Sequence, residues 1–218
     1  MYKRQVVAPL TEQSGSGGST TPGGAPAATP GLTTSTSSGS EGGYPVLAAV
    51  HGTPADSVKW ALEEEKLYPD LVLSGINEGQ NYGILGNLFS GTVGAARQAA
   101  KLWVHSIATS QEIGVHPDFP AGVTATLQLL EEWRIGASGT PHMEVPSINI
   151  PTCSAGSVRA TADGTGLLRT VVDLTGRAAQ TSDCLSVVAE GDIEDDVHGV
   201  GEGFATVADM TRNELPLP

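Results

Sequence analysis

The chain has 218 residues, which is enough for one ordinary domain and marginal for two. Its 24 acidic residues outnumber 11 lysines and arginines, and the formal net charge of −13 repels the phosphate backbone of DNA or RNA. No apolar run approaches the roughly 18 residues of a membrane span, and the first residues lack the apolar core of a signal peptide. We therefore expect a cytoplasmic protein that has neither a nucleic acid polymer nor a membrane as its partner.

The first half of the chain predicts alternating strands and helices. A strand at 6–9 is followed by a stretch dominated by Gly, Ser, Thr and Pro, which cannot bury enough apolar surface to offset its ordering entropy. Residues 20–43 are predicted to be a flexible low-complexity insertion within a single domain, 1–218. Beyond this insertion, apolar spacing and propensity predict a helix at 54–66, a strand at 70–75, a loop at 76–89, a helix at 92–103 and a strand at 104–109.

The second half continues the pattern less strongly. The spacing of Val123, Leu127 and Leu130 predicts an amphipathic helix at 119–134, buried through these side chains. A strand at 147–151 ends at Pro151. Weaker strand segments follow at 157–162, 170–174 and 204–210. The whole order predicts an α/β fold: a Rossmann-like, mostly parallel sheet with helices on both faces and a C-terminal β arm or extension.

Two predicted loops follow strands and carry oxygen donors. Ser14 lies in the Gly/Ser-rich loop after the first strand, and Asn77 follows the strand at 70–75. Ligands of open parallel sheets bind beyond the carboxyl ends of the strands, and hard cations such as Mg²⁺ take oxygen ligands. The alternative is that Asn77 and Asn81 only stabilise tight turns, where asparagine is common.

Ser90, Gly91 and Thr92 open the Ala-rich helix predicted at 92–103. The start of a helix presents unpaired N–H groups and a positive dipole, and glycine lets an anion approach the backbone. These three residues are therefore candidate phosphate-binding residues. The alternative is that Ser90 is only a helix N-cap.

Other polar clusters are better explained without chemistry. Thr53 and Asp56 have the spacing of a capping box with Asp in place of Glu, and adjacent acids such as Asp195 and Asp196 are usually a solvated face. Cys153 and Cys184 belong to no CxxC motif and cannot build a framework of disulfides, so they are expected to be packing residues. There is no nucleophile elbow and no P-loop, and a dinucleotide-binding fold stays a weak alternative because the G-x-G-x-x-G fingerprint is missing.

In their order along the chain, several segments resemble the stationary-phase survival protein SurE family of metal-dependent 5′/3′-nucleotidases. The interval between Ser-Gly-Ile-Asn at 74–77 and Ser-Gly-Thr-Val at 90–93 is the most specific match. The remaining matches are Val-Val-Ala-Pro at 6–9 with Ser-Gly-Ser-Gly at 14–17, Gly-Thr-Pro-Ala-Asp at 52–56, Ile-Asn-Ile-Pro at 148–151, Asp-Asp at 195–196 and Glu-Gly-Phe at 202–204.

The resemblance implies a divalent metal, Mg²⁺ or Mn²⁺, with Ser14 and Asn77 at positions of metal ligands. Ser90, Gly91 and Thr92 match the phosphate-facing helix start, and a C-terminal arm implies a homodimer or homotetramer. The family also has a first strand that ends in an acidic pair, and no segment here matches it. The chain is therefore expected to be truncated at its N-terminus, and no catalytic side chain is assigned.

These observations predict a metal-dependent phosphomonoesterase that hydrolyses nucleoside 5′/3′-monophosphates. Two neutral ligands hold Mg²⁺ poorly without carboxylates. The alternative function is therefore a non-catalytic nucleotide- or phosphate-binding module that kept the fold but lost its metal site.

Overall fold

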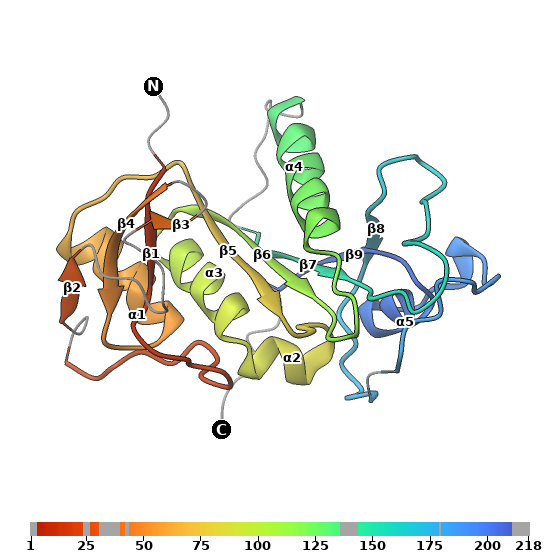
Figure 1. Cartoon of the computed structure of the whole chain (residues 1–218), viewed down its shortest axis with the longest axis horizontal. Helices are drawn as coiled ribbons and strands as arrows, with labels where there is room; N and C mark the ends of the chain where they lie inside the picture. Colours follow the sequence, from red (N-terminus) through yellow and green to blue (C-terminus); the bar gives the residue numbers. More distant parts are fainter. Residues whose placement is uncertain are drawn as a thin grey trace.

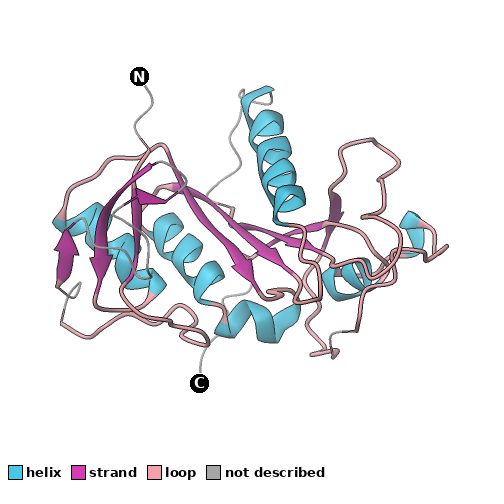
Figure 2. Cartoon of the chain, in the orientation of Figure 1, coloured by secondary structure: helices cyan, strands magenta, loops and turns pink. Residues whose placement is uncertain are grey.

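The strands of the computed structural model form two separate sheets, flanked by helices (Figures 1 and 2). The structure describes residues 4–23, 27–30, 40–41, 44–135, 144–178 and 180–210. The smaller sheet contains β1 (Val6–Pro9), β2 (Ala28–Pro30), β3 (Ser40–Glu41) and β4 (Tyr44–Val50). Strand β4 pairs in parallel with β1 and in antiparallel fashion with β2 and β3.

The larger sheet has the strand order β5-β6-β7-β9-β8. Its first three strands are parallel, β9 runs antiparallel to β7, and β8 is parallel to β9. The strands are β5 (Leu71–Glu78), β6 (His105–Gln111), β7 (Pro146–Ile150), β8 (Leu168–Thr170) and β9 (Thr206–Asp209). The predicted α/β class with a mostly parallel sheet is confirmed.

Helical segments flank both sheets, and the larger sheet is covered on both of its faces. They are α1 (Pro54–Lys59), its π-helical continuation η1 (Trp60–Glu64), α2 (Gly83–Phe89), α3 (Gly91–Lys101), α4 (Phe119–Ile135), the 3₁₀ turn η2 (Glu190–Asp192) and α5 (Asp196–Gly201). Successive residues of a strand point to opposite faces. Accordingly Leu71 packs in the cluster beneath α4, whereas Val72 packs with Val58 of α1 and Ala95 of α3.

The predicted buried face of the helix at 119–134 is wrong for Val123 and Leu127, whereas Leu130 is partly buried against the main core as predicted. Val123 and Leu127 are 50% and 59% exposed, and the buried positions of α4 include Ala125 and Leu129 instead. Small residues let the helix approach β6 and β7 closely, and Thr126 donates or accepts a hydrogen bond with Thr109 of β6. The spacing of large apolar residues alone therefore assigned Val123 and Leu127 to the wrong side of the helix.

Several boundaries also differ from expectation. Strand β5 continues beyond 75 to Glu78, and the predicted loop at 76–89 contains helix α2. Of the weak C-terminal segments, 204–210 contains β9, 170–174 meets β8 only at Thr170, and 157–162 contributes one isolated bridge at Arg159. Because β9 pairs directly with β7, this region extends the main sheet.

Within the predicted insertion at 20–43, the structure describes 20–23, 27–30 and 40–41. These parts include β2 and β3, both paired with β4, so a wholly unstructured insertion is not what the described residues show. The rest of the prediction for 20–43 lies outside the described residues.

The prediction for the two cysteines is wrong as well. Cys153 and Cys184 form a disulfide with a Cα–Cα distance of 5.6 Å. The bond joins the loop after β7 to the loop that precedes η2, which are 31 residues apart in the sequence. Sequence spacing could not reveal this pairing, because it depends on how the long connections fold back beside the sheet.

Candidate functional site

The predicted site residues gather in one crevice of about 690 Å³ at the carboxyl ends of β1 and β5. Its lining includes Ser14 and Asn77 together with Ser90, Gly91 and Thr92 at the start of α3. The two loops and the helix start therefore converge, as the sequence predicted. The crevice also contains side chains that sequence reasoning missed, among them Glu12 and Gln80.

The loop that carries Ser14 is fixed against α3 by close backbone packing. The N–H of Gly17 donates to the carbonyl of Phe89 over 3.0 Å. A side chain at Gly94 would place its Cβ only 2.1 Å from the carbonyl oxygen of Gly17. Glycine at position 94 is therefore required for the loop to lie directly on the helix.

The same loop is also held by the start of α1. The Asp56 carboxylate accepts hydrogen bonds from the backbone N–H and the hydroxyl of Thr21 at 2.9 and 2.8 Å. It also accepts from the N–H of Thr53, and the Thr53 hydroxyl caps the N–H of Asp56. The predicted capping box is confirmed, and its acid additionally connects the helix to the loop.

Hydrogen bonds at Asp56 decide its charge state. Burial alone raises the pKa of a carboxyl group, because it disfavours the ion. Here the bonds from Thr53 and Thr21 outweigh burial and hold the pKa of Asp56 below its ordinary value. The ionised carboxylate is thus the form that stabilises this connection.

Ser14 and Glu12 form a local pair in the crevice. The backbone N–H of Ser14 donates to Glu12 Oε1 over 2.7 Å, and the Ser14 hydroxyl donates to the same oxygen. These bonds keep the pKa of Glu12 below its usual range, the hydroxyl bond having the larger effect. Because the Ser14 proton is directed at Glu12, the lone pairs of its oxygen remain available to a ligand.

Asn77 is oriented in a comparable way. Its Nδ2 donates to the carbonyl oxygen of Gly79 over 2.8 Å, which leaves Oδ1 as the available acceptor. Asn77 pairs with Ser110 of β6 just beyond a register shift in β5. The Nδ2 of Asn77 therefore stabilises the turn, as the alternative predicted. The Oδ1 of the same side chain remains free to bind a ligand.

The start of α3 supplies the positive end of a helix. Ser90 Oγ accepts the N–H of Val93 over 3.1 Å, so Ser90 is the N-cap. The first N–H groups of a helix have no partner within the helix, which suits an anion near Gly91 and Thr92. Ser16 adds a buried hydroxyl that has no hydrogen-bond partner in the described part of the chain, and a Cβ at Gly91 would lie 3.0 Å from it.

Asn81 lines the crevice, and its backbone N–H and side-chain Nδ2 are hydrogen-bonded within the fold. Its N–H donates to Asn149 Oδ1 over 2.8 Å, and its Nδ2 donates to Ser110 Oγ over 2.6 Å. Asn81 therefore connects the loop after β5 to β6 and β7. These bonds reach residues 68 and 29 positions away in the sequence, so they differ from the local turn role given to Asn81 in the alternative.

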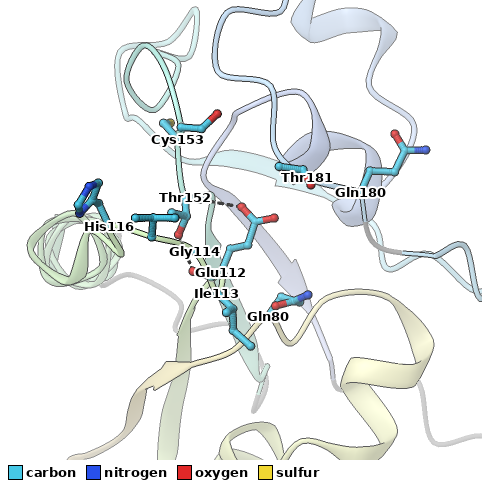
Figure 3. Close-up of a pocket in the computed structure, with 11 residues that line it drawn as sticks. Gln80, Glu112, Ile113, Gly114, His116, Thr152, Cys153, Gln180 and Thr181 are labelled. Carbon is cyan, nitrogen blue, oxygen red and sulfur yellow. Dashed lines mark hydrogen bonds between the residues drawn. The ribbon is translucent and has the colours of Figure 1, made fainter.

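A second pocket of about 540 Å³ lies beside the crevice (Figure 3). Gln80 and Ile113 line both, so the two spaces are neighbours. The lining of the second pocket includes polar residues, namely Gln80, Glu112, His116, Thr152 and Gln180. Among the described residues, Gln80 Oε1 is buried and has no hydrogen-bond partner.

Glu112 is a fixed element of this second pocket. Its Oε2 accepts from the N–H of Thr152 over 2.7 Å and from the hydroxyl of Ser182 over 2.6 Å. Figure 3 shows Glu112 among the labelled pocket residues, with its bond to Thr152 drawn. Nothing in the sequence pattern marked Glu112, because its partners come from distant loops.

The prediction of a solvated face at Asp195 and Asp196 is wrong. Asp195 caps α5 by accepting the N–H of His198, and Asp196 is fully buried. The Asp196 carboxylate accepts N–H groups of Gly83, Asp173 and Val197, which joins α2 and the loop after β8 to α5. Burial raises the pKa of Asp196 in spite of these bonds.

The donor set of the crevice suits a weakly held divalent cation. Ser14 and Asn77 each present an oxygen acceptor, and Glu12 is the carboxylate beside Ser14, so the residues fit a weak oxygen site that retains several waters. In the described ranges, however, no group of three or more His, Cys, Asp and Glu side chains could hold a metal.

The described ranges also contain no helix that is long and apolar enough to cross a membrane.

The fold and the crevice define a class: a Rossmann-like α/β protein with a ligand site at the carboxyl edge of its parallel strands. The family model described as "Survival protein SurE" matches residues 2–170. The chain belongs to the SurE family.

Individual relatives match parts of the chain. The 5′-nucleotidase SurE 2 of Pyrobaculum aerophilum is 44% identical over 117 residues, covering 54% of this chain and 44% of its own length. The 5′-nucleotidase SurE of a Synechococcus strain is 31% identical over 170 residues, covering 74% of this chain and 64% of its own. The match thus spans less than half of the Pyrobaculum relative.

A solved structure supports the fold. The crystal structure of the SurE protein from Aquifex aeolicus has a TM-score of 0.57 and 25% sequence identity. The similarity covers 75% of this chain and 68% of that chain. The shared architecture includes the α/β class expected from the sequence.

Proposed function

We propose that the crevice binds the phosphate of a nucleoside 5′- or 3′-monophosphate and that the protein is a phosphomonoesterase. The observation that carries this proposal is the convergence of the Ser14 loop, Asn77 and the start of α3 on one crevice. Family membership supports it, since the matched relatives bear the name 5′-nucleotidase. The net charge of −13 makes such local donors necessary, because the surface as a whole repels an anionic substrate.

In this arrangement the phosphate oxygens face the first N–H groups of α3 at Gly91 and Thr92. Hydrogen bonds from these groups, and from the hydroxyl of Ser16, stabilise the negative charge on the transferring phosphoryl group. The neighbouring pocket receives the nucleoside. There the side-chain amides of Gln80 and Gln180 provide hydrogen-bond donors and acceptors for a base or a ribose hydroxyl.

A divalent cation, Mg²⁺ or Mn²⁺, is part of the proposal. Ser14 and Asn77 would hold it through their free oxygens, with the Glu12 carboxylate beside them. Such a cation supplies charge neutralisation at the phosphate and a lowered pKa for water. Because two of these donors are neutral, the affinity for the cation is expected to be low.

The decisive assay is phosphate release from AMP with Mn²⁺ or Mg²⁺, with and without a chelator. We expect release that depends on the cation, and a loss of at least about tenfold in kcat/KM for Ser14→Ala and Asn77→Ala. The matched control is Ser157→Ala, an exposed serine outside the crevice, which should behave like the parent protein. Calorimetric titration of Mn²⁺ into each variant measures cation binding apart from turnover.

The absence of a carboxylate cluster in the described residues favours one second candidate. This is a non-catalytic nucleotide- or phosphate-binding module. It predicts that AMP binds, as measured by calorimetry, while no phosphate is released with either cation. Such a result would replace the enzyme proposal.

The family resemblance also supports a homodimer or homotetramer. The exposed apolar pair Val123 and Leu127 on α4 provides surface for contact between copies. Light scattering after size exclusion measures the mass in solution. A monomer at all concentrations would contradict this part of the proposal.

A further inference from the structure

The second pocket contains a buried carboxylate, that of Glu112. Glu112 is 6% exposed and follows directly on β6, at the carboxyl end of that strand. The next residue, Ile113, lines both the second pocket and the phosphate crevice, and its side chain is mostly exposed. The loop after β6 therefore belongs to both spaces. A ligand whose phosphate lies in the crevice can extend past Ile113 to Glu112.

The two oxygens of the Glu112 carboxylate differ in their hydrogen bonding. Oε2 accepts two donors, the N–H of Thr152 and the hydroxyl of Ser182, which occupy both of its lone pairs. The other oxygen, Oε1, has no hydrogen-bond partner in the residues that the structure describes. Figure 3 shows this second oxygen turned toward the side of the pocket where Thr181 and Gln180 lie. Because a buried anion with an unpaired oxygen is costly, Oε1 favours a ligand that brings hydrogen-bond donors.

The orientation of this carboxylate is fixed by two segments of the chain. Thr152 directly precedes Cys153, and Ser182 lies two residues before Cys184, so the disulfide joins the two segments that hold Oε2. The Thr152 hydroxyl also donates to the backbone carbonyl oxygen of Glu112. An acceptor that is held in one orientation before binding can distinguish ligands by the pattern of their donors.

The bases of nucleotides differ in the groups on their Watson–Crick edge, which proteins read by hydrogen bonds. Guanine has two adjacent donors there, N1–H and the N2 amino group. Adenine and cytosine each have one amino donor beside a ring nitrogen that is an acceptor, and uracil has one N–H between two carbonyl oxygens. An anionic oxygen with two free lone pairs can accept both guanine donors, whereas it repels the ring nitrogen of adenine or cytosine.

We propose that Glu112 makes the site selective for guanine nucleotides, with Oε1 accepting N1–H and the N2 amino group of the base. This inference rests on the proposed function, which places the phosphate at the start of α3. The side-chain amides of Gln80 and Gln180 line the same pocket and can donate to O6 of guanine. AMP keeps the phosphate contacts but lacks the two adjacent donors, so it is a ligand of lower affinity.

The test is calorimetric titration of the whole chain with GMP, IMP and AMP in the presence of EDTA, which prevents cation-dependent hydrolysis during the measurement. IMP differs from GMP only in the absence of the N2 amino group. We expect GMP to bind at least about tenfold more tightly than IMP, because IMP loses a hydrogen bond to a charged group. AMP should bind no more tightly than IMP. Equal affinities for GMP and IMP would overturn the proposal.

A variant assigns the preference to Glu112. Glu112→Gln keeps the size of the side chain and removes its charge, so the affinity for GMP should fall at least about tenfold while that for AMP changes less than about twofold. The matched control is Glu64→Gln, an exposed glutamate outside the pocket lining, which should bind both nucleotides like the parent protein. Equal losses for GMP and AMP in Glu112→Gln would show a purely structural role and overturn the proposal. Urea unfolding verifies that each variant is folded, and the comparison of GMP with IMP needs no variant.

Guanosine and ribose 5-phosphate separate this inference from the proposed function, because each carries one part of GMP. A preference for guanosine over inosine without binding of ribose 5-phosphate would contradict the phosphate site and support the role of Glu112. Binding of ribose 5-phosphate with equal affinities for guanosine and inosine would support the phosphate site and overturn the role of Glu112. If none of these compounds binds, both proposals are overturned.

Discussion

Gly94 lies where the Ser14 loop crosses helix α3, and its missing side chain sets the distance between them. In Gly94→Ala the new Cβ would meet the Gly17 carbonyl oxygen at 2.1 Å and Gly18 Cα at 2.8 Å, so the loop must move. We expect a loss of about 1–3 kcal/mol in the free energy of unfolding and weaker AMP binding. Urea denaturation and calorimetry measure both. Gly191→Ala is the control, since nothing lies within 4 Å of its Cβ.

Asp56 predicts a pH dependence of stability. Its pKa is lowered in the folded protein, because the bonds from Thr53 and Thr21 outweigh the opposing effect of burial. A lowered pKa stabilises the fold above the ordinary value of 3.8 and loses this contribution as the pH falls through the folded value. We expect Asp56→Asn to cost about 1–3 kcal/mol at pH 7. The difference from the parent protein should shrink below pH 3.8.

Unfolding by urea at a series of pH values measures this difference. A gap between Asp56→Asn and the parent protein that stays constant from neutral to acidic pH would contradict the role of the ionised carboxylate. Asp118→Asn is a useful comparison, because that carboxylate is exposed and accepts one local hydrogen bond from Ala121. Its effect should be smaller at every pH.

At the scale of elements, α4 shows that two leucines two residues apart have opposite environments. Leu129 is 1% exposed in the main core, whereas Leu127 is 59% exposed. We expect Leu129→Ala to cost about 2–5 kcal/mol, because it leaves a cavity beneath the sheet. At protein concentrations where light scattering shows a monomer, Leu127→Ala should change stability by less than about 0.5 kcal/mol. Equal losses in urea denaturation would mean that Leu127 is covered in solution, as in an assembly of copies.

The elements also show what local pattern can and cannot supply. The strands β1 and β5, the helix α3 and the capping box at Thr53 follow from apolar runs, propensity and cap residues, all of which act within a few residues. Their convergence on Ser14 and Asn77 follows from the general geometry of parallel sheets. These features were therefore accessible from the sequence.

Features that depend on distant partners were not accessible. Asp196 is buried because it accepts N–H groups from 83 and 173, and Glu112 is fixed by groups at 152 and 182. No local sequence pattern identifies the hydrogen-bond partners of Asp196 or of Glu112. The buried face of α4 was only partly predicted for a related reason, since small residues such as Ala125 and Thr126 form part of it beside Leu129.

At the scale of the whole molecule, the disulfide between Cys153 and Cys184 connects loops 31 residues apart, next to the second pocket. In the chain-entropy model, a closed loop of this length stabilises the fold by about 3–4 kcal/mol. We expect the midpoint of urea unfolding to fall when dithiothreitol is added. A Cys153→Ser, Cys184→Ser double variant should have the same midpoint of urea unfolding as the reduced protein. Adding dithiothreitol should not change the midpoint of this variant.

Reduction should also affect substrate binding more than the chemical step, because Cys153 lines the proposed nucleoside pocket and not the phosphate crevice. A rise in the KM for AMP with little change in kcat is the expected signature.

Thiol titration of the native protein gives the redox state of Cys153 and Cys184 directly. The cytosol keeps most thiols reduced, so a bond that stays intact in freshly isolated protein would contradict the expected cytoplasmic location. Two free thiols in a protein of unchanged stability would instead show that the loops are held by their hydrogen bonds, such as that from Ser182 to Glu112.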